Sequence, residues 1–161
     1  MKQKTLPQEG LKLIACITML IDHFGHAIVP YLPVPYMVEL YYACRIMGRL
    51  AFPIYCFLLV EGFQRTSSFE KYLLRVGAAA LVCELPFNLA YSGKLLDLGS
   101  RNPVFGMFIC LIMLYFFSRY AEKGLKNLLM KALIAAAAFL WCRMLVIDQG
   151  VCLVILVGFL W

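Results

Sequence analysis

The feature that most constrains this chain is a series of long apolar runs divided by short polar segments. A helix that crosses a bilayer needs about 20 mostly apolar residues, and the runs lie at about 11–29, 45–63, 69–91, 103–120, 126–147 and 150–161. Hydrophobic residues make up 63% of the 161 residues and charged residues only 15%, too few to cover a small soluble domain. We therefore expect one all-α, polytopic membrane helix bundle over residues 1–161, with five full transmembrane helices and a short sixth.

The same figures exclude disorder, and the basic residues never gather into the patch that nucleic-acid binding requires. They do favour one side of the predicted membrane. Ten lie at the N-terminus and in the second and fourth loops, namely Lys2, Lys4, Lys12, Arg65, Lys71, Arg75, Arg119, Lys123, Lys126 and Lys131, against four on the other side, namely Arg45, Lys94, Arg101 and Arg143. The positive-inside rule therefore predicts a cytoplasmic N-terminus.

Prolines and glycines predict where the helices break. Pro33 and Pro35 favour a loop over residues 31–44. Pro86 is expected to kink the third helix or end it early. Gly48 and the step Ala51-Phe52-Pro53 indicate close packing or a bend in the second helix.

The seven cysteines lie almost entirely within apolar runs, without a Cys-x-x-Cys motif or a histidine at zinc-ligand spacing. This placement favours small buried hydrophobic side chains over a disulfide framework. No metal site is expected.

Ionisable side chains within the first run are functional candidates, because charges inside a membrane span are costly. Asp22 and His26 are one helical turn apart and can meet on one face, whereas adjacent Asp22 and His23 diverge by about 100°. Lys12 precedes His23 by eleven residues, which places both on one stripe about 16 Å apart. The alternatives are a polar cap at the membrane interface for the acid and histidines, and plain positive-inside anchoring for Lys12.

The later runs carry further polar candidates. Arg45 and Arg49 are one turn apart, and two cations side by side in a membrane require an anion: Asp22, a lipid phosphate, or a ligand phosphate or carboxylate. Snorkelling to the headgroups is the alternative, and it suits Arg45 better than Arg49. Glu61 lies near an inner helix end, while Glu84 and Asn88 are cavity candidates, Asn88 being able to satisfy the carbonyl that Pro86 frees.

Several of these residues fall in motifs that resemble the TraX family. The resemblance runs in order over residues 11–106, and its most specific parts are Asp-His-x-Gly and Arg-x-x-Gly-Arg-x-Ala-Phe-Pro. The matching segments are Leu11-Lys12-Leu13-Ile14-Ala15, Met19-Leu20-Ile21-Asp22-His23-Phe24-Gly25, Arg45-Ile46-Met47-Gly48-Arg49-Leu50-Ala51-Phe52-Pro53-Ile54-Tyr55, Glu61-Gly62-Phe63, Arg65-Thr66, Lys71-Tyr72 with Arg75, Leu85-Pro86-Phe87-Asn88-Leu89-Ala90, and Asn102 with Val104-Phe105. The chain departs from the family at Pro103 and Gly106, where other residues, including a threonine, are common.

The resemblance implies an activity. The family's namesake is similar to membrane acetyltransferases and is associated with N-acetylation of conjugative pilin, and the family looks distantly related to larger integral membrane acyltransferases. In their O-acetylase branch an arginine and a histidine lie eleven residues apart in the first helix, and Lys12 and His23 reproduce that spacing. The resemblance thus implies acetyl-CoA as the donor, a bacterial inner-membrane location, and His23 rather than His26 as the base.

The remaining roles follow from the same resemblance. Asp22 and His26 would tune or orient the base, Arg45 and Arg49 would stabilise an oxyanion or hold Asp22 ionised, and Lys12 would meet a CoA phosphate. If the arginine pair binds CoA phosphates instead, it lies on the wrong side in the expected topology. Direct transfer and an acetyl-histidine intermediate both remain open.

The acceptor stays open as well: a pilin N-terminus, a glycan or a small molecule. Two other classes of function compete with the enzyme. One is a small transporter or proton-coupled channel that uses Asp22 and the histidines as a relay and the arginines to recognise an anion. The other is a non-catalytic membrane partner of a conjugation or secretion complex. Residues 150–161 would span about 18 Å as a helix, short of a bilayer core of about 30 Å, so we expect a shortened or minimal member of the family.

Overall fold

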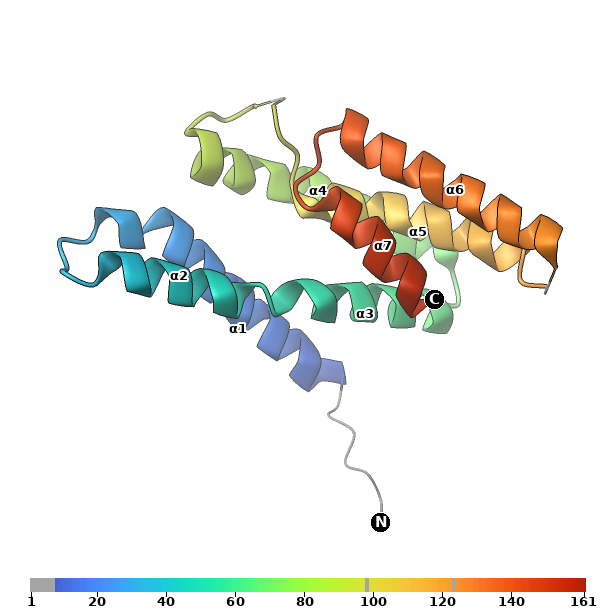
Figure 1. The fold of residues 1–161 in the computed structure, drawn as a ribbon, viewed down its shortest axis with the longest axis horizontal. Helices are drawn as coiled ribbons and strands as arrows, with labels where there is room; N and C mark the ends of the chain where they lie inside the picture. The colour runs from blue at the N-terminus through green and yellow to red at the C-terminus, as the bar shows by residue number, and fades with distance from the viewer. Residues whose placement is uncertain (1–7, 98, 123) are drawn as a thin grey trace, which may run out of the picture. The chain divides into compact units, whose positions relative to one another are not determined.

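The computed structural model describes residues 8–97, 99–122 and 124–161, and within these ranges the chain folds into seven α-helices and one 3₁₀ turn (Figure 1). It forms two compact units, the first ending at Leu58 and the second running from Leu59 to Trp161. The elements are α1 (Gln8–Ala27), η1 (Val29–Tyr31), α2 (Met37–Gly48), α3 (Ala51–Arg65), α4 (Phe69–Ser92), α5 (Pro103–Arg119), α6 (Leu125–Met144) and α7 (Gly150–Leu160).

Four helical segments are long and apolar enough to cross a membrane, namely Gln8–Tyr31, Met37–Arg65, Phe69–Ser92 and Leu125–Met144. The helices α5 and α7 are apolar but shorter. The chain therefore has the all-helical character of a multi-pass membrane protein, as predicted. The count of five helices plus a sixth, and the cytoplasmic N-terminus, stay predictions. Lys2, Lys4 and Lys123, which enter the charge count, lie outside the described residues.

The first unit is built on a hairpin of α1 and α2, which lie side by side (Figure 1). Two glycines allow the close approach: a Cβ on Gly25 would collide with Cys44, and one on Gly48 would collide with Asp22. Small residues at a crossing let helix backbones come together in a membrane. The hairpin therefore brings the polar end of α1 directly against α2.

The second predicted helix, 45–63, is corrected in two ways. Helix α2 already begins at Met37, so residues 37–44, which were expected to lie in the loop 31–44, are helical. Proline restricts mainly itself and the residue before it, and the influence of Pro35 has ended by Met37. The helix also breaks at Arg49–Leu50 before α3 begins. Pro53 accounts for this break, because it has no N–H to donate to Arg49 and its ring would crowd that carbonyl. Both the predicted bend and the predicted close packing of Gly48 are confirmed.

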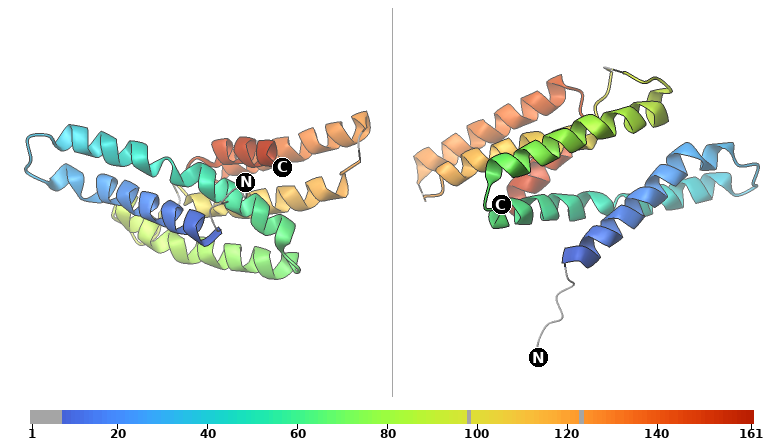
Figure 2. Two further views of the ribbon diagram at one scale, coloured as in Figure 1. Left: turned by 90° about the horizontal axis from the view of Figure 1, so that it is seen from below. Right: turned by 180° about the vertical axis from the view of Figure 1, so that it is seen from behind.

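The second unit packs around α5, which contacts α4, α6 and α7 (Figure 2). Leu111 and Leu114 of α5 are fully buried. Asn102 caps α5 by accepting a hydrogen bond from the Val104 N–H at 2.9 Å. Pro103 occupies the first turn of α5, where a missing N–H costs the helix nothing. The helix α4 does not end at Pro86 but continues to Ser92, where Gly93 terminates it with a φ of 67°.

A chain of aromatic rings joins four helices at one end of the second unit. Phe63 lies 5.5 Å from Trp161 and 5.8 Å from Phe69, measured between ring centroids. Phe69 stacks on Tyr115 at 4.6 Å, and the Arg119 guanidinium lies over the Tyr115 ring. Amphipathic rings and arginines of this kind are typical of the membrane–water interface.

The prediction of buried cysteines holds for part of the set. Cys44, Cys56, Cys110 and Cys142 are buried, Cys83 is half-buried, and Cys16 and Cys152 are exposed. All seven are free thiols.

Candidate functional site

The centre of the first unit's polar site is an ion pair between α1 and α2. Arg45 Nη1 donates to Asp22 Oδ2 at 2.6 Å, and the two side chains are 24% and 19% exposed. The missing side chain of Gly48 leaves the room that the Asp22 carboxylate occupies. Among the anions predicted for the arginine pair, Asp22 is therefore the one that Arg45 meets. A charge-assisted bond of this length is among the stronger hydrogen bonds in proteins.

His23 lies beside this pair without being bonded to it. Its Nδ1 is 4.0 Å from Asp22 Oδ2, and its side chain is 55% exposed. That separation is too long for a hydrogen bond, as expected for adjacent helical residues whose side chains diverge. The imidazole thus stands next to a negative charge and remains open to a reactant.

His26 lies near the same pair. It is one turn after Asp22, half-buried, and close enough to Asp22, Arg45 and His23 to interact electrostatically with all three. The structure therefore brings Asp22, His23, His26 and Arg45 together. Helical spacing predicted the meeting of Asp22 with His26 alone.

The other two candidates of this unit stand apart from the pair. Arg49 is exposed just beyond the end of α2. Its backbone N–H donates to the Arg45 carbonyl at 3.2 Å, but its side chain makes no hydrogen bond or ion pair with any residue of the described ranges. Lys12 is exposed on α1. Because α1 is one unbroken helix from Gln8 to Ala27, Lys12 and His23 are about 16 Å apart along its axis.

Sequence reasoning missed one contact of the first unit. The Tyr55 hydroxyl of α3 lies 3.3 Å from the Cys16 thiol of α1. No motif pointed to this pair, because neither residue is charged and they are far apart in the chain.

A second polar cluster lies in the second unit around Glu84, which is 6% exposed. Arg101 Nη1 donates to Glu84 Oε1 at 3.1 Å. The backbone N–H and the side-chain amide of Asn102 donate to Oε2 at 3.2 and 2.6 Å. The Asn102 amide also donates to the Ala80 carbonyl at 2.9 Å. Glu84, predicted as a cavity candidate, is thus saturated by the residues that start α5.

The same cluster extends to the segment after α6. The Arg101 N–H donates to the Val146 carbonyl at 3.0 Å, and the Asp148 N–H donates to the Arg101 carbonyl at 3.0 Å. The sequence offers a signal for Asn102, because asparagine before proline is a common helix start. It offers none for Arg101, which the charge count treats only as a loop residue.

Asn88 and Glu61 have unused hydrogen-bonding capacity. Asn88 is 2% exposed and its Nδ2 finds no partner among the described residues, so it does not satisfy the carbonyl that Pro86 frees. Glu61 Oε1 pairs with Arg65 Nη2 at 2.6 Å, but its Oε2 is buried without a partner in the described ranges. Within those ranges there is also no group of three or more His, Cys, Asp and Glu residues placed to hold a metal ion.

Comparison with known proteins gives one match. A family model described as TraX protein matches residues 7–161. No curated protein and no solved structure matches the chain.

Proposed function

This chain belongs to the TraX family, and from that membership we propose that it is an integral membrane acetyltransferase of the bacterial inner membrane. It would move an acetyl group from acetyl-CoA to an amine or hydroxyl acceptor. The observation that carries the proposal is the exposed His23 imidazole next to the Asp22–Arg45 pair. Histidine is the side chain best suited to proton transfer near neutral pH.

In the proposed reaction His23 acts as the general base. Its Nε2 takes the proton of the acceptor N–H or O–H while the acceptor atom forms a bond to the thioester carbonyl carbon. The carbon–sulfur bond then breaks, and the CoA sulfur leaves as a thiol with the proton that the His23 imidazolium gives up, so that His23 returns to its neutral form. The Asp22 carboxylate, held by Arg45 at 2.6 Å, would stabilise the imidazolium that forms 4.0 Å away.

The two remaining cations would handle the donor. Arg49 is exposed and carries no internal partner in the described ranges, so its guanidinium is available for the oxyanion of the tetrahedral intermediate. Lys12 would bind a CoA phosphate as a point charge, with the thioester about 16 Å away at His23. If the Arg49 end faces the cytoplasm, the roles change and Arg49 would bind the phosphate.

The test compares two histidine variants of the purified full-length chain. With labelled acetyl-CoA and an extract of cell membranes as acceptor, His23→Ala should lower acetyl transfer by about 10²–10⁴-fold while acetyl-CoA still binds. His26→Ala is the matched control and should retain most transfer. Loss of transfer in His26→Ala with survival in His23→Ala would refute the assignment of the base. A search for acetylated products in cells with and without His23 would identify the acceptor. The search should cover all products, because a pilin N-terminus is only one of the candidate acceptors.

A proton-coupled transporter is the second candidate, because His23 and His26 both lie near the Asp22–Arg45 pair. Asp22 and the two histidines would serve equally as a proton relay. Labelled acetyl-CoA that never binds, together with a proton-dependent anion flux in proteoliposomes, would decide for the transporter.

A further inference from the structure

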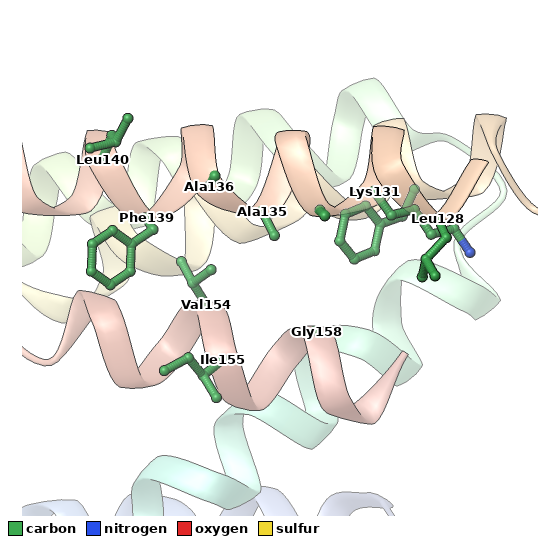
Figure 3. A pocket seen from close by; sticks show the side chains of 11 residues that line it. Leu128, Lys131, Ala135, Ala136, Phe139, Leu140, Val154, Ile155 and Gly158 are labelled. Carbon is green, nitrogen blue, oxygen red and sulfur yellow. The ribbon is translucent and has the colours of Figure 1, made fainter. Parts of the chain in front are cut away.

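The second unit contains an open groove between α6 and α7 (Figure 3). Phe117 of α5 also lines it. Its volume is about 700 Å³, within the usual range of ligand sites. Apolar side chains line nearly all of it, among them Leu128, Ala135, Phe139 and Val154. The groove lies between the 20-residue α6 and the 11-residue α7.

The surroundings of the groove are apolar as well. Helix α6 is one of the segments long and apolar enough to cross a membrane. Leu133 and Leu140 of α6 are 65% and 59% exposed, and Ile155 of α7 is 65% exposed. In a bilayer these side chains face lipid, so the groove opens to acyl chains rather than to water.

One end of the groove is charged. Among the described residues that line it, Lys131 alone carries a charge, and it lies at the opposite end from Phe139 and Leu140 (Figure 3). Its ammonium is 6.0 Å from the centroid of the Phe117 ring, and the side chain is half-buried. Lys131 is about 9 Å from the start of α6.

The position of Lys131 matches the level of lipid headgroups. The helix ends on that side carry Arg119, stacked on Tyr115, and the exposed Lys126 in the first turn of α6. Aromatic and basic residues gather at this depth of a bilayer. A lysine placed just inside it keeps its stem in the apolar region and its ammonium at the phosphates.

We propose that this groove binds an anionic phospholipid, with one acyl chain between α6 and α7 and the headgroup phosphate on Lys131. Charge complementarity favours this occupant. A second copy of the chain would bring its own net charge of +6 at pH 7 toward Lys131, whereas phosphate supplies the opposite charge at one end of an apolar tail.

The first experiment separates the charge from the groove. The full chain in detergent micelles is titrated with phosphatidylglycerol or phosphatidylcholine of identical acyl chains, and bound lipid is counted by native mass spectrometry. We expect a preference for phosphatidylglycerol of about fivefold, the effect of one basic residue near anionic lipid. Lys131→Met should abolish the preference, and Lys126→Met, on the same helix but outside the groove, should retain it.

A second variant fills the groove. A Cβ added to Gly158 meets no atom within 4 Å, so Gly158→Leu can be accommodated and should reduce binding of both lipids. Equal binding of the two lipids by the unmodified chain would overturn the proposal, and so would equal loss in Lys126→Met and Lys131→Met. Conversion of a dimer into a monomer by Gly158→Leu would show that a second copy is the occupant instead.

Discussion

Each of the two units contains a carboxylate on an apolar helix that is paired with an arginine, but the two pairs are completed differently. Asp22 accepts from Arg45 at 2.6 Å, and two histidines stand beside it. Glu84 accepts from Arg101 at 3.1 Å and additionally from the backbone and side chain of Asn102. Asp22 is 19% exposed at its side chain and Glu84 only 8%.

The difference separates a candidate reactive site from a purely structural cluster. We call the cluster of Glu84, Arg101 and Asn102 the Glu84 joint, because it fixes α4 to the start of α5. A buried carboxylate is tolerated when donors satisfy its oxygens, and at Glu84 those donors fix where α5 starts. Both carboxylate oxygens of Glu84 already accept hydrogen bonds from these donors, so neither is available to a proton or a reactant. At Asp22 the neighbouring groups are titratable and His23 is open, as a chemical role requires. Saturation, rather than charge alone, therefore distinguishes the two.

The largest effect on stability should come from Glu84→Ala. This change removes the acceptor of the Arg101 guanidinium and one of the two acceptors of the Asn102 amide. Breaking a buried pair by removing one partner costs about 3–5 kcal/mol. The free energy of unfolding of the purified chain, measured with urea in detergent micelles, checks this expectation.

Asp22→Ala is the matched control, and it should reverse the pattern. It should cost less stability than Glu84→Ala, since both members of the Asp22–Arg45 pair are partly exposed. It should nevertheless reduce acetyl transfer more strongly per folded molecule. Equal loss of stability in the two variants would erase the distinction between site and joint.

Much of the fold could be predicted because its causes are local in the sequence. Apolar runs of sufficient length gave the approximate positions of α1, α4, α5, α6 and α7. The start of α2 at Met37 was missed because the two prolines before it dominate the local pattern. The break at Arg49–Leu50 was foreseen only as a bend, because Pro53 sets its place from four residues away.

The site was predicted where helical spacing decides it. The grouping of Asp22 with His26 follows from one turn of helix, and Arg45 was foreseen as a partner of Asp22. The saturation of Glu84 by Asn102 was not, because the two are 18 residues apart and meet only once α4 and α5 have packed. Long-range hydrogen bonds of this kind leave no periodic signal in a sequence.

A smaller effect is expected from Gly48→Ala, which tests whether the hairpin crossing holds the Asp22 pair. The new Cβ would collide with Asp22, and overpacking of this kind costs about 1–3 kcal/mol. Displacement of the carboxylate should also lower acetyl transfer. Gly158→Ala is the control, because its Cβ meets no atom within 4 Å. An equal free energy of unfolding in the two variants would contradict the proposed role of Gly48.

The smallest effect should come from the segment that completes the Glu84 joint. Gln149, the residue before α7, has a φ of 54°, in the left-handed region that disfavours residues with a side chain. Gln149→Gly should remove that strain and raise the free energy of unfolding by about 0.5–1 kcal/mol, the gain being limited by the greater freedom of glycine in the unfolded chain. Ser68→Gly is a matched control, because Ser68 also precedes a helix without a side-chain capping bond but has a φ of −140°, so it should lose a few tenths of a kcal/mol. A gain at Gln149 with no change in acetyl transfer would show that the joint is held under strain independently of the site, whereas a loss would mean that the Gln149 side chain stabilises the joint more than its backbone strains it.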